Sequence, residues 1–388
     1  MTQLNDLLAT MENAVQNPLQ AINQYIAERK RPVIGCAPEY CPEEIVYAAG
    51  MLPAGLWGGA TTISNANMYF PSFACSLVQT TLELGMRGVY DQLSGVIIPA
   101  HCDHLKCFGQ DWKVAVPQVT FIPLAHPLNR KLEAATEYLK SEYSRIKSVL
   151  EEIGGTSISD QALNDAIEVY NDHRKTLREF TLIAQDHCAT ITASIRHMVI
   201  KSGYFMDKLE HTLLVKQLID ELKKAPGEKW NGKKVVLTGI MAEPNELLDL
   251  FAEYGLAVVA DDLAQESRQF RTDIPQGSDP LERLARYWSC MEGCSLLYDP
   301  QKNRRFLLKS MVEESKADGV VACIMKFCEM EEFDYPIYKK TLEEAGIPLL
   351  YLELDQITPS LEQARTRIQS FAEMMTTQPN LDRKGSLK

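Results

Sequence analysis

Three cysteines of the chain stand where a predicted strand ends or a predicted helix begins. Cys102 directly follows a buried apolar strand predicted at 95–100, and Cys328 lies shortly after another predicted at 318–324. Cys75 precedes a predicted helix, whose first backbone N–H groups and dipole favour a thiolate. Ligands of open α/β sheets bind beyond the carboxyl ends of the strands, so all three positions suit a site. Three thiolates suffice to hold a 4Fe–4S cluster by three corners, which leaves one iron open.

Other ligand sets combine different members of the ten cysteines. Three pairs have four residues between their members: Cys36/Cys41, Cys102/Cys107 and Cys323/Cys328. His101 and His104 lie beside Cys102 and are possible zinc ligands, although the cysteine pairs lie on separate strand–helix units. Cys323 falls inside a predicted strand and Cys188 in a polar helical stretch, so we interpret both as structural. Spacing alone leaves the alternatives open, because the first three cysteines match no compact ligand motif.

An acidic group follows the apolar run 256–260, where Asp261 and Asp262 are succeeded by Glu266 and Arg268. We interpret these carboxylates first as helix N-terminal residues that stabilise the helix dipole, and second as part of a site. The aromatic residues Phe327, Phe333 and Tyr335 are interpreted as core. The chain has no dinucleotide-binding, P-loop or nucleophile-elbow motif.

Short apolar runs alternate with helical patterns at both ends of the chain, which predicts parallel sheets covered by helices. We expect two doubly wound, Rossmann- or flavodoxin-like domains joined by a helical segment. The first domain spans 1–150 and carries Cys75 and Cys102, the helical segment spans 151–228, and the second domain spans 229–388 and carries Cys328. The predicted strands lie at 31–36, 51–57, 93–100 and 119–125, and then at 234–240, 256–261, 295–299, 318–324 and 347–354.

The overall charge argues against one class of partner. Forty Lys and Arg against 52 Asp and Glu give a net charge of −12, which repels nucleic-acid backbones. The N-terminus reads as an amphipathic helix and not as a signal peptide, and the sequence lacks the run of about 18 apolar residues that a membrane span needs. We therefore expect a cytoplasmic protein with no nucleic-acid or membrane partner.

Five ordered blocks of sequence resemble the 2-hydroxyacyl-CoA dehydratases. They are GCAPEYCPEEIVYAAGMLPAGLWGG, FPSFACSLVQ, HCDHLKCFGQ, ADDLAQESRQFRTDIPQG and IMKFCEMEEFDYP, and the likeness runs from about residue 30 to 375. More narrowly, they are similar to the β-subunits (component D) of the lactoyl-CoA, 2-hydroxyisocaproyl-CoA and 2-hydroxyglutaryl-CoA enzymes. The resemblance implies a 4Fe–4S cluster held by Cys75, Cys102 and Cys328. Glu329 and Met330 stand where the last block usually has Asp-Pro, which changes the turn but keeps the thiol.

The resemblance also implies the reaction and its partners. An (R)-2-hydroxyacyl-CoA loses water to give a 2-enoyl-CoA through a ketyl radical, after an ATP-driven one-electron activation. A dehydratase α-subunit and an ATP-dependent iron–sulfur activator protein are the implied partners, and an acyl-CoA is the substrate. The alternatives are a homodimeric reductive protein of the same superfamily, with a double-cubane cluster or akin to benzoyl-CoA reductase, and a non-catalytic metal-binding scaffold. Cys290 and Cys294 could contribute to a double-cubane cluster, but the stretch 260–270 has no cysteine. Nothing in the sequence identifies a catalytic side chain.

Overall fold

The computed structural model describes residues 2–357 and 360–377 of the chain. Its first sheet has four parallel strands in the order β2-β1-β3-β4. Their bounds are β1 Val33–Cys36, β2 Leu52–Gly55, β3 Gly95–Pro99 and β4 Thr120–Leu124. The helices of this half are α3 Glu43–Ala48, α4 Ser76–Met86, α5 Asp103–Ala115 and α6 Glu133–Gly154, with a short 3₁₀ turn η1 at Ala66–Met68. The chain reverses its winding direction between β1 and β3, and this switch point is where doubly wound folds bind ligands.

The second sheet repeats the first, with four parallel strands in the order β6-β5-β7-β8. The strands are β5 Lys233–Gly239, β6 Leu256–Leu263, β7 Gly319–Met325 and β8 Leu349–Leu354. Its helices are α10 Asn245–Glu253, α11 Ser267–Phe270, α13 Arg304–Ser315, α14 Glu329–Glu344 and α15 Glu362–Thr377. Strand β7 is apolar and wholly buried, and β5 is buried after its first two lysines, as expected for central strands covered on both faces. The predicted fold class of two doubly wound parallel sheets is confirmed.

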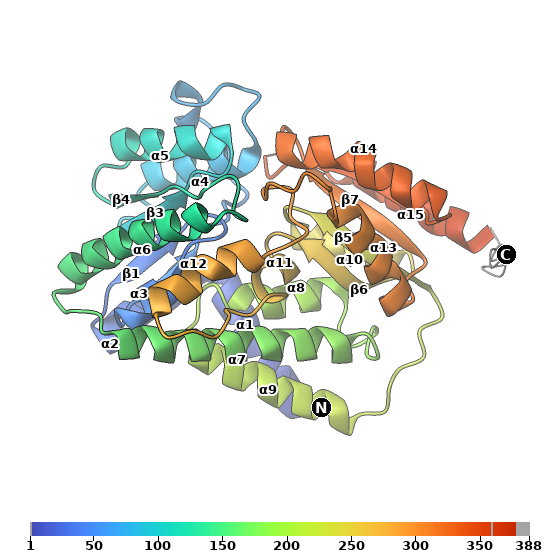
Figure 1. Cartoon of the computed structure of the whole chain (residues 1–388). Coiled ribbons are helices and arrows are strands. Elements are labelled where there is room, and N and C mark those ends of the chain that lie inside the picture. Colours follow the sequence, from blue (N-terminus) through green and yellow to red (C-terminus); the bar gives the residue numbers. More distant parts are fainter. Residues whose placement is uncertain (1, 358–359, 378–388) are drawn as a thin grey trace.

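Helices from the N-terminus and the middle of the chain form a separate layer. They are α1 Thr2–Gln16, α2 Pro18–Arg29, α7 Asp160–Ala184, α8 Ala193–Ser202 and α9 Lys208–Lys224. Leu7 and Met11 of α1 share one core with Phe180 of α7 and Leu218 of α9. In Figure 1 helices α7 and α9 run along the lower side of both domains. Among the described residues, no helix has the length and apolar character that crossing a bilayer requires.

One segment of the second half packs against the first half. Helix α12, Pro280–Cys290, lies against α6, and Trp288 and Leu284 share a core with Ile97 of β3. The prediction of a strand at 295–299 is wrong, because these residues form turns and irregular structure. Leu297 is nevertheless buried in the same core, which explains why the segment is apolar. The chain therefore crosses between its two sheets more than once.

Candidate functional site

The three predicted site cysteines all occupy the same local position, the residue that caps the N-terminus of a helix. Cys75 caps α4, Cys102 caps α5 and Cys328 caps α14. They line one open pocket between the two α/β units, with a volume of about 650 Å³. This volume lies in the range of about 300–1,000 Å³ that is typical of small-molecule and cofactor sites. The structure thus brings together three thiols that are far apart in the sequence.

Burial and mutual repulsion both oppose ionisation of these thiols. The pKa of Cys75 is raised to about 12, mainly by burial and also by the neighbouring Cys102, although the N–H groups of Val78 and Leu77 oppose the shift. Burial likewise raises the pKa of Cys102. It raises the pKa of Cys328 well above its usual value, with Glu331 and the other two thiols adding to the effect.

A positively charged partner would reverse this balance. Metal ions bind thiolates and remove their protons, and each helix N-terminus adds N–H groups that favour the negative sulfur. Three soft sulfur donors in one pocket suit iron–sulfur chemistry, whose clusters are held by thiolates. In the chemical type of their donors, the residues present therefore fit a cluster held at three corners.

The remaining walls of the pocket are largely apolar. Phe70, Phe73 and Phe327 line it together with Leu296, and His104, Lys106 and Glu329 supply polar groups. Phe327 has a positive φ of 64°, an uncommon conformation for a bulky residue, and it directly precedes Cys328. Phe333, interpreted from the sequence as core, is 71% exposed on α14, so that interpretation is wrong for this residue.

The competing cysteine pairs do not share the pocket, with one exception. Cys323 is fully buried within β7, and Cys36 is buried in β1. Cys107 does line the pocket beside Cys102 and is exposed.

The structure separates the two histidines on which the zinc alternative depends. The ring of His101 stacks on that of Trp288 and packs against the tilted ring of His126, while His104 lines the cysteine pocket. Over residues 2–357 and 360–377, no group of three or more His, Cys, Asp or Glu side chains is arranged so that it could hold a metal ion.

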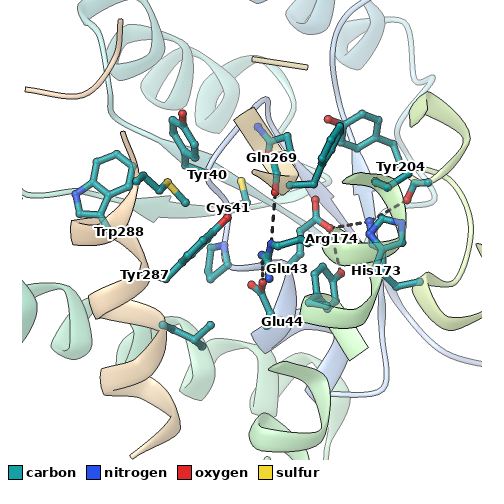
Figure 2. Close-up of a pocket in the computed structure, with 18 of the residues that line it drawn as sticks. Tyr40, Cys41, Glu43, Glu44, His173, Arg174, Tyr204, Gln269, Tyr287 and Trp288 are labelled. Carbon is teal, nitrogen blue, oxygen red and sulfur yellow. Dashed lines mark hydrogen bonds and ion pairs between the residues drawn. The ribbon is translucent and has the colours of Figure 1, made fainter. Parts of the chain in front are cut away.

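A second pocket, shown in Figure 2, is much smaller, at about 70 Å³. Its charged side chains are already paired with each other. Arg174 forms an ion pair with Glu44, and Lys208 lies 3.0 Å from the Glu43 carboxylate, which also accepts from the Tyr170 hydroxyl at 3.0 Å. A space of this size holds a few water molecules and is too small for an acyl-CoA.

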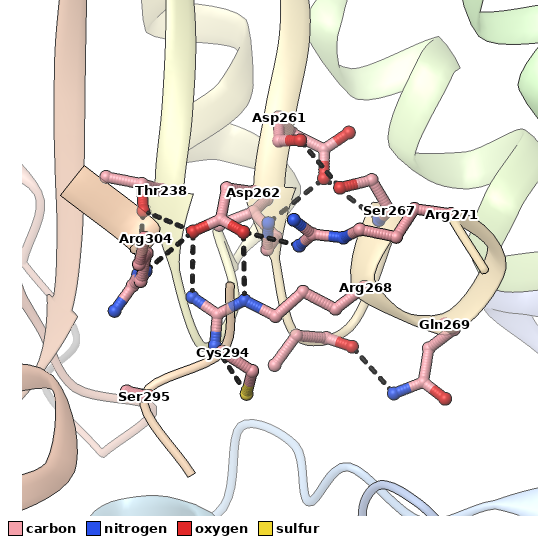
Figure 3. Close-up of polar contacts among 12 residues, drawn as sticks. Thr238, Asp261, Asp262, Ser267, Arg268, Gln269, Arg271, Cys294, Ser295 and Arg304 are labelled. Atoms are coloured by element: carbon pink, nitrogen blue, oxygen red, sulfur yellow. Dashed lines mark hydrogen bonds and ion pairs between the residues drawn. The ribbon is translucent and has the colours of Figure 1, made fainter. Parts of the chain in front are cut away.

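The acidic group noted in the sequence belongs to a buried ion-pair network (Figure 3). Both aspartates lie within β6. Asp261 accepts from the backbone N–H of Ser267, the first residue of α11, as the helix-dipole interpretation expects. Asp262 does not follow that interpretation, because Arg268, Arg271 and Arg304 bind it. These arginines hold the pKa of Asp262 far below its usual range despite complete burial.

The network reaches the cysteine pocket through Glu331, in the first turn of α14 after Cys328. Glu331 accepts from Arg268 at 3.0 Å and from Arg304 at 2.9 Å. Arg268 also donates to the Cys294 sulfur at 3.2 Å, which connects the network to the segment packed on the first sheet. Arg304 and Glu331 were not identified from the sequence. Their charge was visible, but only the fold brings them into one network with Asp262.

The fold and the pocket define a two-domain α/β protein that gathers three thiols from separate domains at one site. A family model described as "2-hydroxyglutaryl-CoA dehydratase, D-component" matches residues 38–375. The chain belongs to this family of dehydratase subunits, which confirms the resemblance noted in the sequence.

Three similar proteins each align with nearly the whole chain. The lactoyl-CoA dehydratase subunit beta of Anaerotignum propionicum is 46% identical, and the (R)-phenyllactyl-CoA dehydratase beta subunit of Clostridium sporogenes is 45% identical; each alignment covers 97% of this chain and 100% of the relative. The (R)-2-hydroxyglutaryl-CoA dehydratase subunit beta of Acidaminococcus fermentans is 39% identical over 96% of this chain and 100% of its own.

Proposed function

We propose that the chain acts as the β-subunit of an anaerobic (R)-2-hydroxyacyl-CoA dehydratase, a hydro-lyase that forms a 2-enoyl-CoA. The observation that carries the proposal is the pocket in which Cys75, Cys102 and Cys328 cap three helices. Family membership over nearly the whole chain supports the reaction class.

Cys75, Cys102 and Cys328 would hold a 4Fe–4S cluster at three of its corners. Such a cluster supplies one-electron transfer and an open iron. The chain's own residues contribute the environment. Helix N–H groups stabilise the negative sulfurs, and the apolar side chains of Phe70 and Phe327 limit the access of water.

The substrate chemistry explains why a redox protein is needed. The hydrogen lost from the β-carbon of a 2-hydroxyacyl-CoA is hardly acidic, and the leaving hydroxyl lies α to the carbonyl. One electron added to the thioester carbonyl gives a ketyl radical that expels the hydroxyl as hydroxide. The β-proton then becomes acidic and leaves, and the electron is returned when the enoyl-CoA forms. The overall reaction consumes no electrons, so ATP is needed only to start it.

The proposal includes two protein partners and a cytoplasmic location. A dehydratase α-subunit would complete a heterodimer, which the "beta" in the names of similar proteins supports. An ATP-dependent iron–sulfur activator would deliver the first electron. The homodimeric reductase is less well supported, because a benzoyl-CoA reductase protein of Thauera aromatica is only 24% identical.

The test reconstitutes the reaction under strict anoxia. The chain is co-expressed with the α-subunit and mixed with activator, ATP, reductant and lactoyl-, phenyllactyl- or 2-hydroxyglutaryl-CoA. We expect enoyl-CoA from at least one substrate, with far less than one ATP hydrolysed per product. Stoichiometric ATP use in every turnover would indicate a net reductase. Full activity of this chain without the α-subunit would favour the homodimeric alternative.

A further inference from the structure

The cysteine pocket needs the two α/β units to be held in one arrangement, since Cys75 and Cys102 come from the first and Cys328 from the second. We propose that Gln356 is a positioning residue that clamps the end of β8 onto helix α4 and thereby fixes Cys75 relative to Cys328. The inference rests on the proposed cluster, because it concerns the spacing of the cluster's expected ligands.

Gln356 makes three hydrogen bonds to the first α/β unit. Its backbone N–H donates to the Ser76 hydroxyl at 3.1 Å, and its side-chain Nε2 donates to the Trp57 carbonyl oxygen at 2.8 Å. Its Oε1 accepts from the Thr80 hydroxyl at 2.8 Å. Ser76 directly follows Cys75, and Thr80 lies one turn further along α4. The carboxamide therefore uses both its donor and its acceptor on the first unit, and its acceptor binds the helix that Cys75 caps.

On the second α/β unit, strand pairing and backbone hydrogen bonds connect Gln356 to Cys328. Leu354, two residues before Gln356, pairs in register with Met325 at the end of β7. The Leu354 carbonyl oxygen accepts from Lys326 N–H at 2.8 Å, and the Met325 carbonyl oxygen accepts from Cys328 N–H at 2.9 Å. A continuous path of backbone and hydrogen bonds thus joins the two thiols.

The chain leaves room for the clamp at Gly58. This residue has a φ of +68°, and a Cβ atom there would lie 2.2 Å from Thr80 Oγ1 and 2.6 Å from Gln356 Oε1. Any side chain would push the two partners apart, so glycine is required both by the backbone conformation and by the close approach. The fit of three separate segments at this point is what we expect of a specific contact.

The test variant is Gln356→Glu, which keeps the size of the side chain but places a carboxylate oxygen against the Trp57 carbonyl oxygen. The matched control is Gln363→Glu, an exposed position on α15. The first measurement is hydrogen–deuterium exchange on the full-length chain after its iron has been removed. Loss of the hydrogen bond to the Trp57 carbonyl oxygen, together with the repulsion between the two oxygens, should raise exchange roughly tenfold in peptides covering 55–60 and 74–80. Strands β5 and β7 should exchange as in the wild type, which shows that the fold is kept.

The second measurement is the EPR spectrum and iron content of the anoxically purified full-length variants. We expect Gln356→Glu to broaden or shift the signal of the reduced protein and to lose iron faster to a chelator, while Gln363→Glu matches the wild type. Unchanged exchange at 55–60 and 74–80 would refute the clamp. Raised exchange with an unchanged spectrum and iron loss would refute its positioning role. If Cys75→Ala keeps its iron, the ligand assignment is wrong, and raised exchange in Gln356→Glu would still establish the clamp.

Discussion

Replacing the buried carboxylate of Glu331 by glutamine tests the ion-pair network behind the cysteine pocket. Glu331 is fully buried and accepts from Arg268 at 3.0 Å, from Arg304 at 2.9 Å and from the Ser295 hydroxyl at 2.7 Å. The glutamine keeps the shape but removes the charge that balances the two guanidinium groups. Removing one partner of a buried ion pair costs about 3–5 kcal/mol. Because Asp262 still pairs with both arginines, we expect a loss of about 3 kcal/mol in the free energy of unfolding.

The assay is urea unfolding of the iron-free chain followed by far-UV circular dichroism, with Glu332→Gln as the control. Glu332 is the next residue on α14 and is exposed, so its change should stay within about 0.5 kcal/mol. Burial alone would raise the pKa of Glu331, but Arg304 and Arg268 outweigh burial and lower it. Its contribution is therefore present above the unfolded-state pKa of about 4.3 and is lost as the pH falls further. The gap between wild type and Glu331→Gln should be large at pH 7 and shrink in acid. Equal urea midpoints for Glu331→Gln and Glu332→Gln at pH 7 would refute this reasoning.

Three further changes probe other parts of the molecule. Trp112→Ala empties a fully buried site between α4 and α5 and should lower the free energy of unfolding by about 3–5 kcal/mol in the same urea assay. Burial raises the pKa of Glu39 to about 7, although Arg268 opposes the shift. Because the folded chain then binds this proton more tightly than the unfolded chain does, the wild type should lose stability as the pH rises from about 4.5 to about 7. Glu39→Gln should gain relative to the wild type over that interval, and parallel pH profiles would count against a protonated Glu39. Arg130→Met removes the hydrogen bonds to the Met291 and Tyr298 carbonyl oxygens, so limited proteolysis should cut the 291–298 segment faster. An unchanged cleavage pattern would show that other contacts hold this segment.

The sequence was sufficient to predict the fold class because its central strands are short apolar runs bounded by Gly and Pro. Such runs are ambiguous when a loop is buried, which is why 295–299 was wrongly predicted as a strand: Leu297 lies in the core without any strand partner. The start of helix α14 was also not evident from the sequence. This helix starts at Glu329 and includes Pro336, a residue that usually ends or bends a helix.

The sequence pointed to the three thiols of the candidate pocket, but not to the residues that support them. Cys75, Cys102 and Cys328 could be chosen because strand ends and helix starts leave local signals. Glu331 and Gln356 act through partners that are far away in the sequence, and charge or amide groups alone carry no information about such partners. Gln356 became visible only when the two sheets were placed relative to each other, and Glu331 only when the helices of the second sheet were placed.

The most direct test of the central claim is the iron content of single cysteine variants purified under anoxia. The claim is that Cys75, Cys102 and Cys328 together hold one 4Fe–4S cluster. We predict about four irons per chain in the wild type and in Cys323→Ala, whose thiol is buried within β7. Cys328→Ala should lose most of the iron and the brown absorbance. Equal iron contents in Cys328→Ala and Cys323→Ala, or zinc in place of iron in the wild type, would contradict the claim.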